Sequence, residues 1–526
     1  MNYADLFRVT LPETALEVAA LVVLVVDLAV LRKAALSVRV AVAALLGVAG
    51  CCVSLWAMQG QWQGPLRLEG SRDVLLATGG NAAIAQIGIL VLTGLTLLLL
   101  IDSTFTQNSG EYVSVVLMAA SGGMLIAAAQ DLLVIFVGLE LLSLGLYILT
   151  AFAKQSGKSA EAALKYYLFG GMSAAFLLFG FSYLYGLSGS TYLPRVVYGV
   201  DMAAAHGGAP LLAIALVMIA AGLGFKVAAV PFHLWAPDTY EGAPAPAAAF
   251  IASVSKVASF ALLISISYTA LNYIRSLMQE SPVTGGHSYN TAAAFSVSGP
   301  EHVALTLSLF GGWTSILIVL AVASMIFGNL AALAQIGVRR LVAYSAVAHA
   351  GYILLGLAFF FWGNHSAQAV LYYILTYGLT TIGAFGVVDV VQRATGSDRF
   401  DAFLGLHKRN PVLAGVLLVL FLSLAGIPPL VGFWAKFNLF AAVLGVSAGP
   451  VPFALVALAV ALSAVSLYYY LQVLKRAYVM PGVDETPIKV HPVTMAVLVL
   501  IAAAVVVLGC FPALLQGWIA GFYPVS

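Results

Sequence analysis

Charged residues and cysteines are both scarce in this sequence of 526 residues. Only 8% of the residues are charged, whereas an ordinary soluble domain carries about a quarter, so the charges are too few to cover a water-facing surface. The three cysteines have no CxxC spacing, and we therefore expect no zinc site, iron–sulfur site or disulfide framework. The basic residues are dispersed rather than gathered in a stripe, so nucleic acid is not an expected partner.

Hydrophobic residues, by contrast, make up 62% of the chain and form long runs. A run of about 20 apolar residues crosses the ~30 Å core of a bilayer as a helix. The runs lack the alternation of a membrane barrel, which predicts an all-α polytopic membrane protein with about 14 transmembrane helices. The runs cover approximately 12–31, 40–58, 83–101, 112–128, 132–152, 162–187, 210–235, 244–274, 304–336, 341–362, 367–392, 411–446, 452–474 and 492–516.

The basic residues between the runs predict the orientation of the chain, because Lys and Arg favour cytoplasmic loops. With both termini on the periplasmic side, the outer segments hold Arg8, Arg67, Arg72, Arg195 and Arg275. The inner segments then hold the far larger set of Arg32, Lys33, Arg39, Lys154, Lys158, Arg339, Arg340, Arg393, Arg399, Lys408, Arg409, Lys475, Arg476 and Lys489.

Four lysines remain, and all of them fall inside predicted spans: Lys165, Lys226, Lys256 and Lys436. Lys256 is ten residues past Pro246, roughly 15 Å along a helix, so it is expected deep in the membrane. Glu140, nine residues past Asp131, is expected at a similar depth and needs a partner. Glu17, Asp27 and Asp389 lie nearer the span ends, where a solvated or helix-capping role is expected.

An ionisable side chain at mid-membrane costs about 2.5–3.5 kcal/mol on insertion scales and is a functional candidate. A structural ion pair is the alternative for a single pair, but four lysines and a glutamate on separate helices favour charge movement. His233 and His349 titrate near neutral pH and suit a proton relay, although a lone histidine on a helix is more often a packed one. Neither has a carboxylate or cysteine at ligand spacing, so no metal site is expected.

Prolines interrupt two of the runs in matching positions. Pro231 follows Lys226 in the seventh run, and Pro428 and Pro429 precede Lys436 in the twelfth. Proline removes a backbone donor and opens the helix. In a membrane such breaks line hydrated cavities, and paired breaks in two halves indicate an internal repeat with ion sites at its centre. A kink that serves packing alone is the alternative for either break.

Several motifs resemble the antiporter-like subunits of respiratory complex I, an NADH–quinone oxidoreductase. They are Pro231-Phe-His-Leu-Trp-Ala-Pro-Asp-Thr-Tyr-Glu-Gly-Ala-Pro-Ala-Pro246 with Ser255-Lys256-Val-Ala, Ala163-Leu-Lys165-Tyr-Tyr-Leu-Phe-Gly-Gly, Arg340-Leu-Val-Ala-Tyr-Ser-Ala-Val-Ala-His-Ala-Gly and Gly426-Ile-Pro-Pro-Leu-Val-Gly-Phe. The resemblance covers essentially the whole chain. Asp238-Thr-Tyr-Glu-Gly-Ala-Pro and Ser255-Lys256-Val-Ala resemble the subunit N branch more than its siblings L and M, and the long lateral helix typical of subunit L is not expected after the last span.

The resemblance implies two inverted five-helix repeats and a division of the chain. It implies an N-terminal three-helix segment (1–111), a first repeat (112–278), an outer loop (279–303), a second repeat (304–478) and a C-terminal helix (479–526). Glu140 would be the fifth-helix glutamate and Lys226 its seventh-helix partner, with Lys256 and Lys436 as the eighth- and twelfth-helix lysines. Lys165 and His233 match further polar positions, and His349 completes the candidate proton path.

The same resemblance implies a proton-translocating subunit in the bacterial cytoplasmic membrane, driven by chemistry elsewhere. No nucleotide loop, redox centre or catalytic triad is recognisable in the chain, so NADH, FMN, iron–sulfur clusters and quinone are expected in partner subunits. Other membrane subunits are expected on either side. The alternatives are a subunit of a multi-subunit sodium/proton exchanger, a ferredoxin-driven photosynthetic relative of complex I, and a non-transporting scaffold.

Overall fold

The computed structural model describes residues 7–59, 75–280, 301–360, 366–446, 449–482 and 486–523. Residues 281–300 of the predicted outer loop lie outside the described residues. Within the described ranges the regular elements are helices, joined by three isolated β-bridges. The N-terminal segment contains α2 (Leu11–Val25) with its π-helical extension η1 (Val26–Val30), α3 (Leu36–Met58) and α4 (Gly80–Leu100).

Two groups of helices lie over the ranges 112–278 and 304–478, where the two repeats are predicted; the division of the chain into repeats stays a prediction. The first contains α5 (Ser109–Ala128), α6 (Leu132–Thr150), α7 (Gly157–Ser188), α9 (Ala209–Val227), α10 (Trp235–Gly242), α11 (Ala245–Phe250), η4 (Ile251–Ser255) and α12 (Lys256–Glu280). The second contains α14 (Glu301–Leu333), α15 (Val338–Ala358), α16 (Ser366–Thr395), α18 (Pro411–Ala425), α19 (Val431–Val446) and α20 (Pro450–Tyr478), and α21 (Pro492–Cys510) follows it.

These helices confirm the predicted membrane architecture. In the described part of the chain, 12 helices are long and apolar enough to cross a membrane, and α18 and α19 are shorter apolar helices. Together with α2 and η1 they coincide with the fourteen predicted runs. Two details differ from the prediction. The last run ends earlier, because Pro512 begins a separate helix, α22 (Pro512–Ala520), and the segment after α7 contains a short amphipathic helix, α8 (Leu193–Ala203).

Glycines allow the first two helices of each group to pack closely. A Cβ on Gly122 of α5 would lie 2.6 Å from the backbone nitrogen of Leu142 on α6, and a Cβ on Gly328 of α14 would lie 2.5 Å from that of Ala348 on α15. Small residues are the usual means of bringing helices together in lipid, where the hydrophobic effect gives little help. A glycine at the contact therefore allows close packing in both pairs, α5 with α6 and α14 with α15.

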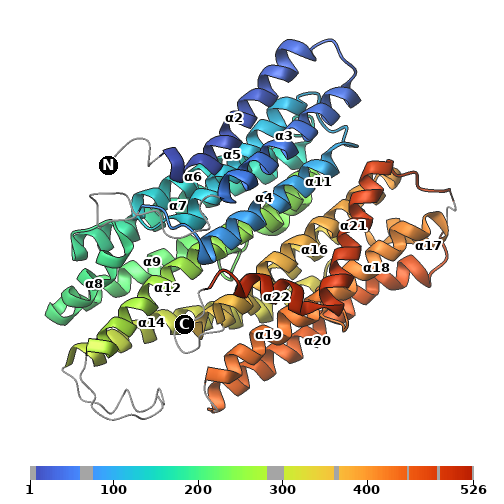
Figure 1. Ribbon diagram of the computed structural model, residues 1–526. Coiled ribbons are helices and arrows are strands. Elements are labelled where there is room, and N and C mark those ends of the chain that lie inside the picture. Colours follow the sequence, from blue (N-terminus) through green and yellow to red (C-terminus); the bar gives the residue numbers. More distant parts are fainter. Residues whose placement is uncertain are drawn as a thin grey trace.

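Helix α4 joins the N-terminal segment to both groups. It packs against α12 and α16, and Figure 1 shows it between the blue-green and the orange-red halves of the molecule. Gly88 of α4 faces Leu375 of α16, and Gly378 of α16 faces Leu92 of α4. The two groups are thus held together by tight helix contacts through this central helix.

The expected role of Asp27 needs correction. Its carboxylate is buried and accepts two hydrogen bonds of 2.7 Å from Arg39, the residue counted above among the loop charges. It also accepts a bond of 3.2 Å from the backbone nitrogen of Gly110 in the first turn of α5. Asp27 therefore caps a helix as expected, but within a buried ion pair rather than in solvent.

The packing of α14 against α15 gives a first prediction. Gly328→Ala should lower the thermal unfolding temperature of the protein in detergent, because the added methyl group meets the backbone of α15 and overpacking costs about 1–3 kcal/mol. Gly312→Ala, on the same helix, has open space around the new Cβ and should leave the temperature unchanged or raise it, since alanine favours helix. Equal effects of the two substitutions would contradict this packing.

Candidate functional site

The first helix break lies at the end of α9. Ala228 has a left-handed backbone conformation (φ 60°) that ends the helix, and Pro231, three residues later, has no N–H with which to continue it. The indole N–H of Trp235 on α10 donates to the freed carbonyl of Phe225 at 2.9 Å. Lys226, in the last turn of α9, is thereby held near the carbonyl end of a half-helix, where a positive charge is favoured.

Lys226 is buried, at 6% exposure, and its ammonium group donates to the Ser143 hydroxyl on α6. Glu140 lies one turn before Ser143, and its negative charge acts on Lys226. In the described part of the chain, however, the salt bridges within 4.0 Å do not include this pair. The expected partner of Lys226 therefore acts at longer range, and the direct contact is a neutral hydroxyl.

Lys256 follows a π-helical turn, η4, at the centre of the eighth span. Such turns widen a helix locally and occur frequently at functional sites. The lysine is 3% exposed, its ammonium group donates to the backbone carbonyl of Ala346 on α15, and it lies 5.4 Å from the centre of the Tyr377 ring. The predicted burial of Lys256 is confirmed, and its partners come from the second group of helices.

The second break holds Lys436. Helix α18 ends at Gly426, whose φ of 89° requires glycine, and Pro428 and Pro429 follow. The Lys436 ammonium group donates to the freed carbonyls of Leu424 and Ala425 at 3.2 and 2.9 Å, and to the Ser463 hydroxyl at 2.8 Å. The break therefore supplies the oxygens that hold this buried charge.

His349, on α15, lies between Lys256 of α12 and Lys436 of α19. Charges on Lys256 and on Lys436 both act on its ring, and its Nδ1 is 2.9 Å from the Tyr373 hydroxyl. Tyr352, one turn further along α15, has its ring centre 5.4 Å from the Lys436 ammonium group. Ala346, His349 and Tyr352 are spaced by three residues on one face of α15, so this helix connects the sites of Lys256 and Lys436.

Lys226, Lys256, His349 and Lys436 are together called the lysine row. Sequence reasoning missed the neutral side chains around it. Hydroxyl and amide groups surround the lysines and His349, and all but the half-buried Ser463 are buried. They are Ser143, Tyr352, Tyr373, Tyr377, Ser463 and Asn329. Tyrosine is common in membrane helices, so each one alone carries little signal. The spacing Tyr373-x-x-Thr376-Tyr377-x-x-Thr380, which places four hydroxyls on one side of α16, was the available clue.

His233 and Lys165 lie outside this row. His233 is 4% exposed and packs edge-on against Phe327, with ring centres 4.7 Å apart, and within the described residues neither ring nitrogen has a hydrogen-bond partner. Lys165 is 40% exposed and forms salt bridges with Glu161 at 2.7 Å and Asp238 at 2.8 Å. Lys165 lies within the span that contains α7, as predicted, but unlike the three lysines of the lysine row it is not buried.

The salt bridges of Lys165 belong to a charge cluster that joins the two groups of helices. Arg340 of α15 bonds Asp238 and Glu241 of α10, each at 2.9 Å. Burial raises the pKa of Asp238, but the hydrogen bonds and charges of Lys165 and Arg340 outweigh it and hold this pKa below its usual range. The cluster therefore stabilises the folded protein at neutral pH.

Comparisons with known proteins agree with this architecture. The profile of a family described as NADH:quinone oxidoreductase/Mrp antiporter, TM, matches residues 129–281 and 277–464. A relative from Acidobacterium capsulatum, NADH-quinone oxidoreductase subunit N 2, is 44% identical over 99% of both chains. A chain of respiratory complex I from Thermus thermophilus is 31% identical with a TM-score of 0.73, covering 96% of this chain and 98% of its own.

A chain of the Mrp complex from Dietzia sp. DQ12-45-1b has a TM-score of 0.74, covers 97% of this chain and 98% of its own, and is 20% identical. At that identity the likeness concerns the fold alone.

The charge cluster predicts a pH dependence. Because the pKa of Asp238 is lowered by folding, its contribution to stability is present above the ordinary carboxyl pKa and is lost as the pH falls through the lowered value. Asp238→Asn should lower the unfolding temperature by a few degrees at pH 7, and this difference from wild type should shrink below about pH 4. Asp401→Asn, at an exposed position, serves as the control. A difference that is constant with pH would contradict the cluster.

Proposed function

The chain belongs to the NADH:quinone oxidoreductase/Mrp antiporter family as a membrane subunit of the proton-translocating complex I type, and we propose that its buried lysines carry the protons. The observation that supports this most directly is the burial of Lys226, Lys256, His349 and Lys436, which come from helices of both groups. Charges that deep are expensive, and each marks a candidate step of an ion pathway.

The first step would depend on Glu140. A charged lysine is disfavoured by burial and favoured by a nearby negative charge. While the Glu140 carboxylate acts on Lys226, the ammonium form is favoured, and the Ser143 hydroxyl accepts one of its protons in a hydrogen bond. If Glu140 is neutralised or withdrawn, Lys226 releases its proton to the next member of the row.

His349 would link the remaining steps. A neutral imidazole accepts at one nitrogen and donates from the other, so it can pass a proton without a net change of its own charge. It lies between Lys256 and Lys436, and Tyr373 holds one of its nitrogens. A role for Lys165 and His233 in the same path stays a prediction, since they lie apart from the row.

The energy for this movement is proposed to come from partner subunits. NADH, FMN, iron–sulfur clusters and quinone would be bound there, and the redox reaction would act on this chain through neighbouring membrane subunits on either side. The relatives from A. capsulatum and T. thermophilus belong to such assemblies by name. The bacterial cytoplasmic membrane, with both termini on the periplasmic side, is the proposed location.

A subunit of a sodium/proton exchanger is the second candidate, because the Mrp chain shares the fold. The 44% identity with a subunit N over the full length favours the complex I assignment. Purification from the native membrane separates the two candidates, since flavin and iron–sulfur proteins should copurify with a complex I subunit and not with an exchanger.

Removing the charge of Lys226 or of Glu140 should strongly reduce proton pumping. Lys226→Ala and Glu140→Gln should each reduce NADH-driven proton pumping in membrane vesicles at least fivefold, with quinone reduction falling in parallel, while the complex still assembles. Lys475→Ala removes a lysine from the exposed end of α20 and should leave both rates unchanged. Normal pumping by the first two variants would mean that the row is structural.

The orientation is tested by reporter fusions. Alkaline phosphatase is active only outside the cytoplasm, so a fusion after Ser526 should be active and one after Met480, beyond the inner end of α20, should not. Green fluorescent protein fused at the same positions should give the opposite pattern. Activity of the phosphatase at Met480 would reverse the proposed topology.

A further inference from the structure

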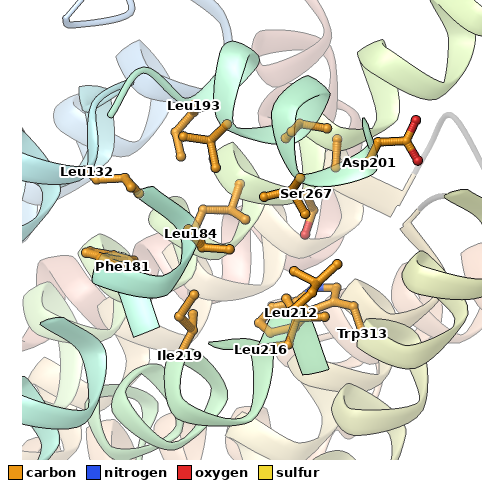
Figure 2. A pocket seen from close by; sticks show the side chains of 15 residues that line it. Leu132, Phe181, Leu184, Leu193, Asp201, Leu212, Leu216, Ile219, Ser267 and Trp313 are labelled. Carbon is orange, nitrogen blue, oxygen red and sulfur yellow. The ribbon is translucent and has the colours of Figure 1, made fainter. Parts of the chain in front are cut away.

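An apolar cavity of about 120 Å³ lies against α8, and none of the buried lysines lines it. Figure 2 shows its lining, to which α7, α8, α9, α12 and α14 contribute. Most of the wall is aliphatic, with Leu193 and Val196 from α8 and Leu212 and Leu216 from α9. Its size is comparable with the ~150 Å³ cavity that takes up a benzene ring in another protein, so it has room for a short apolar segment.

Two buried polar groups face this cavity. The side chains of Trp313 and Ser267 are 5% and 1% exposed, and within the described residues neither the indole N–H nor the hydroxyl has a hydrogen-bond partner. On the same helix the hydroxyls of Ser259 and Thr269 donate to carbonyls one turn back, at 2.8 and 2.9 Å. Ser267 does not, so its hydroxyl is left for a group that occupies the cavity.

The unpartnered groups specify the chemistry of that occupant. An indole N–H only donates, so the occupant needs an oxygen acceptor, and a carbonyl oxygen has two lone pairs that can serve both donors. None of the described residues that line the cavity is basic, which disfavours an anion, and the carboxylate of Asp201 already accepts from the Tyr273 hydroxyl at 2.9 Å. A water molecule would suit the polar side but would leave the aliphatic remainder empty.

The depth of the cavity fits the ester region of a lipid. Ser267 is eight residues before Arg275, the first charged residue after the apolar run, which is about 12 Å along the helix. The level is therefore just inside the membrane surface, where glycerol esters meet the acyl chains. Leu211, Ile214 and Val217 on the outer face of α9 are exposed, so a chain leaving the cavity meets an apolar surface.

We propose that this cavity binds the ester end of one acyl chain of a membrane glycerolipid. The ester carbonyl accepts hydrogen bonds from Trp313 and Ser267, the first methylene groups fill the aliphatic part, and the rest of the chain lies along α9. The site is independent of the proton path, and its occupation neither requires nor supplies a redox reaction.

Photolabelling of the purified, assembled complex tests the site. The probe is a phosphatidylethanolamine with a diazirine on the first methylene groups of one acyl chain, and labelled peptides are identified by mass spectrometry. Label is expected on the α12 and α14 segments that contain Ser267 and Trp313. Excess diester lipid should compete for the site, and excess dialkyl ether lipid, which lacks the carbonyl, should compete several-fold less.

Substitutions in the cavity distinguish lipid bound there from lipid that only covers the outer surface of the protein. Trp313→Phe keeps the apolar bulk but removes the N–H and should reduce labelling several-fold, whereas Ala270→Phe fills the cavity and should abolish it. Trp434→Phe is the matched control, because its indole donates to Gly509 instead, at 2.8 Å, and labelling should be unchanged. Absence of label in wild type, undiminished label in both cavity variants, or equal competition by ether lipid would overturn the proposal.

Discussion

Positive charge buried without an adjacent negative charge is the constraint on which this structure depends. Lys226, Lys256 and Lys436 are held by hydroxyl and carbonyl oxygens, and in the described part of the chain none of them has a carboxylate within salt-bridge distance. An ammonium group in direct contact with a carboxylate would not readily give up its proton, because breaking a buried ion pair is costly. Neutral partners hold a lysine in place without an ion pair to break, which is what the proposed proton transfer requires.

The fold supplies these oxygens by interrupting its helices. A continuous helix uses its own carbonyls, whereas the break before Pro428 leaves those of Leu424 and Ala425 for Lys436. The π-helical turn before Lys256 and the break after Lys226 are further irregularities beside a buried lysine. Tightly packed pairs such as α14 and α15 keep the surroundings rigid, so irregular backbone occurs where a charge requires it.

The spans and the buried lysines could be predicted from the sequence, because a bilayer restricts which residues a membrane helix can contain. The spans follow from apolar length, and each buried lysine is visible as a lone charge in an apolar run. The direct partners could not be predicted, since Ser143 and Tyr377 meet their lysines only through tertiary packing. The partners of Lys165 could not be predicted for the same reason, because the sequence does not show that Asp238 of a distant segment reaches it.

The central claim is that these lysines exchange protons rather than simply carry charge, and Lys256→Arg tests it most directly. Arginine keeps the positive charge and the donors but cannot be deprotonated in a protein. Proton pumping and quinone reduction should be measured in vesicles that contain the assembled variant complex. The account predicts that the complex assembles and pumping is lost. Pumping at the wild-type rate would contradict it and show that the charge alone is needed.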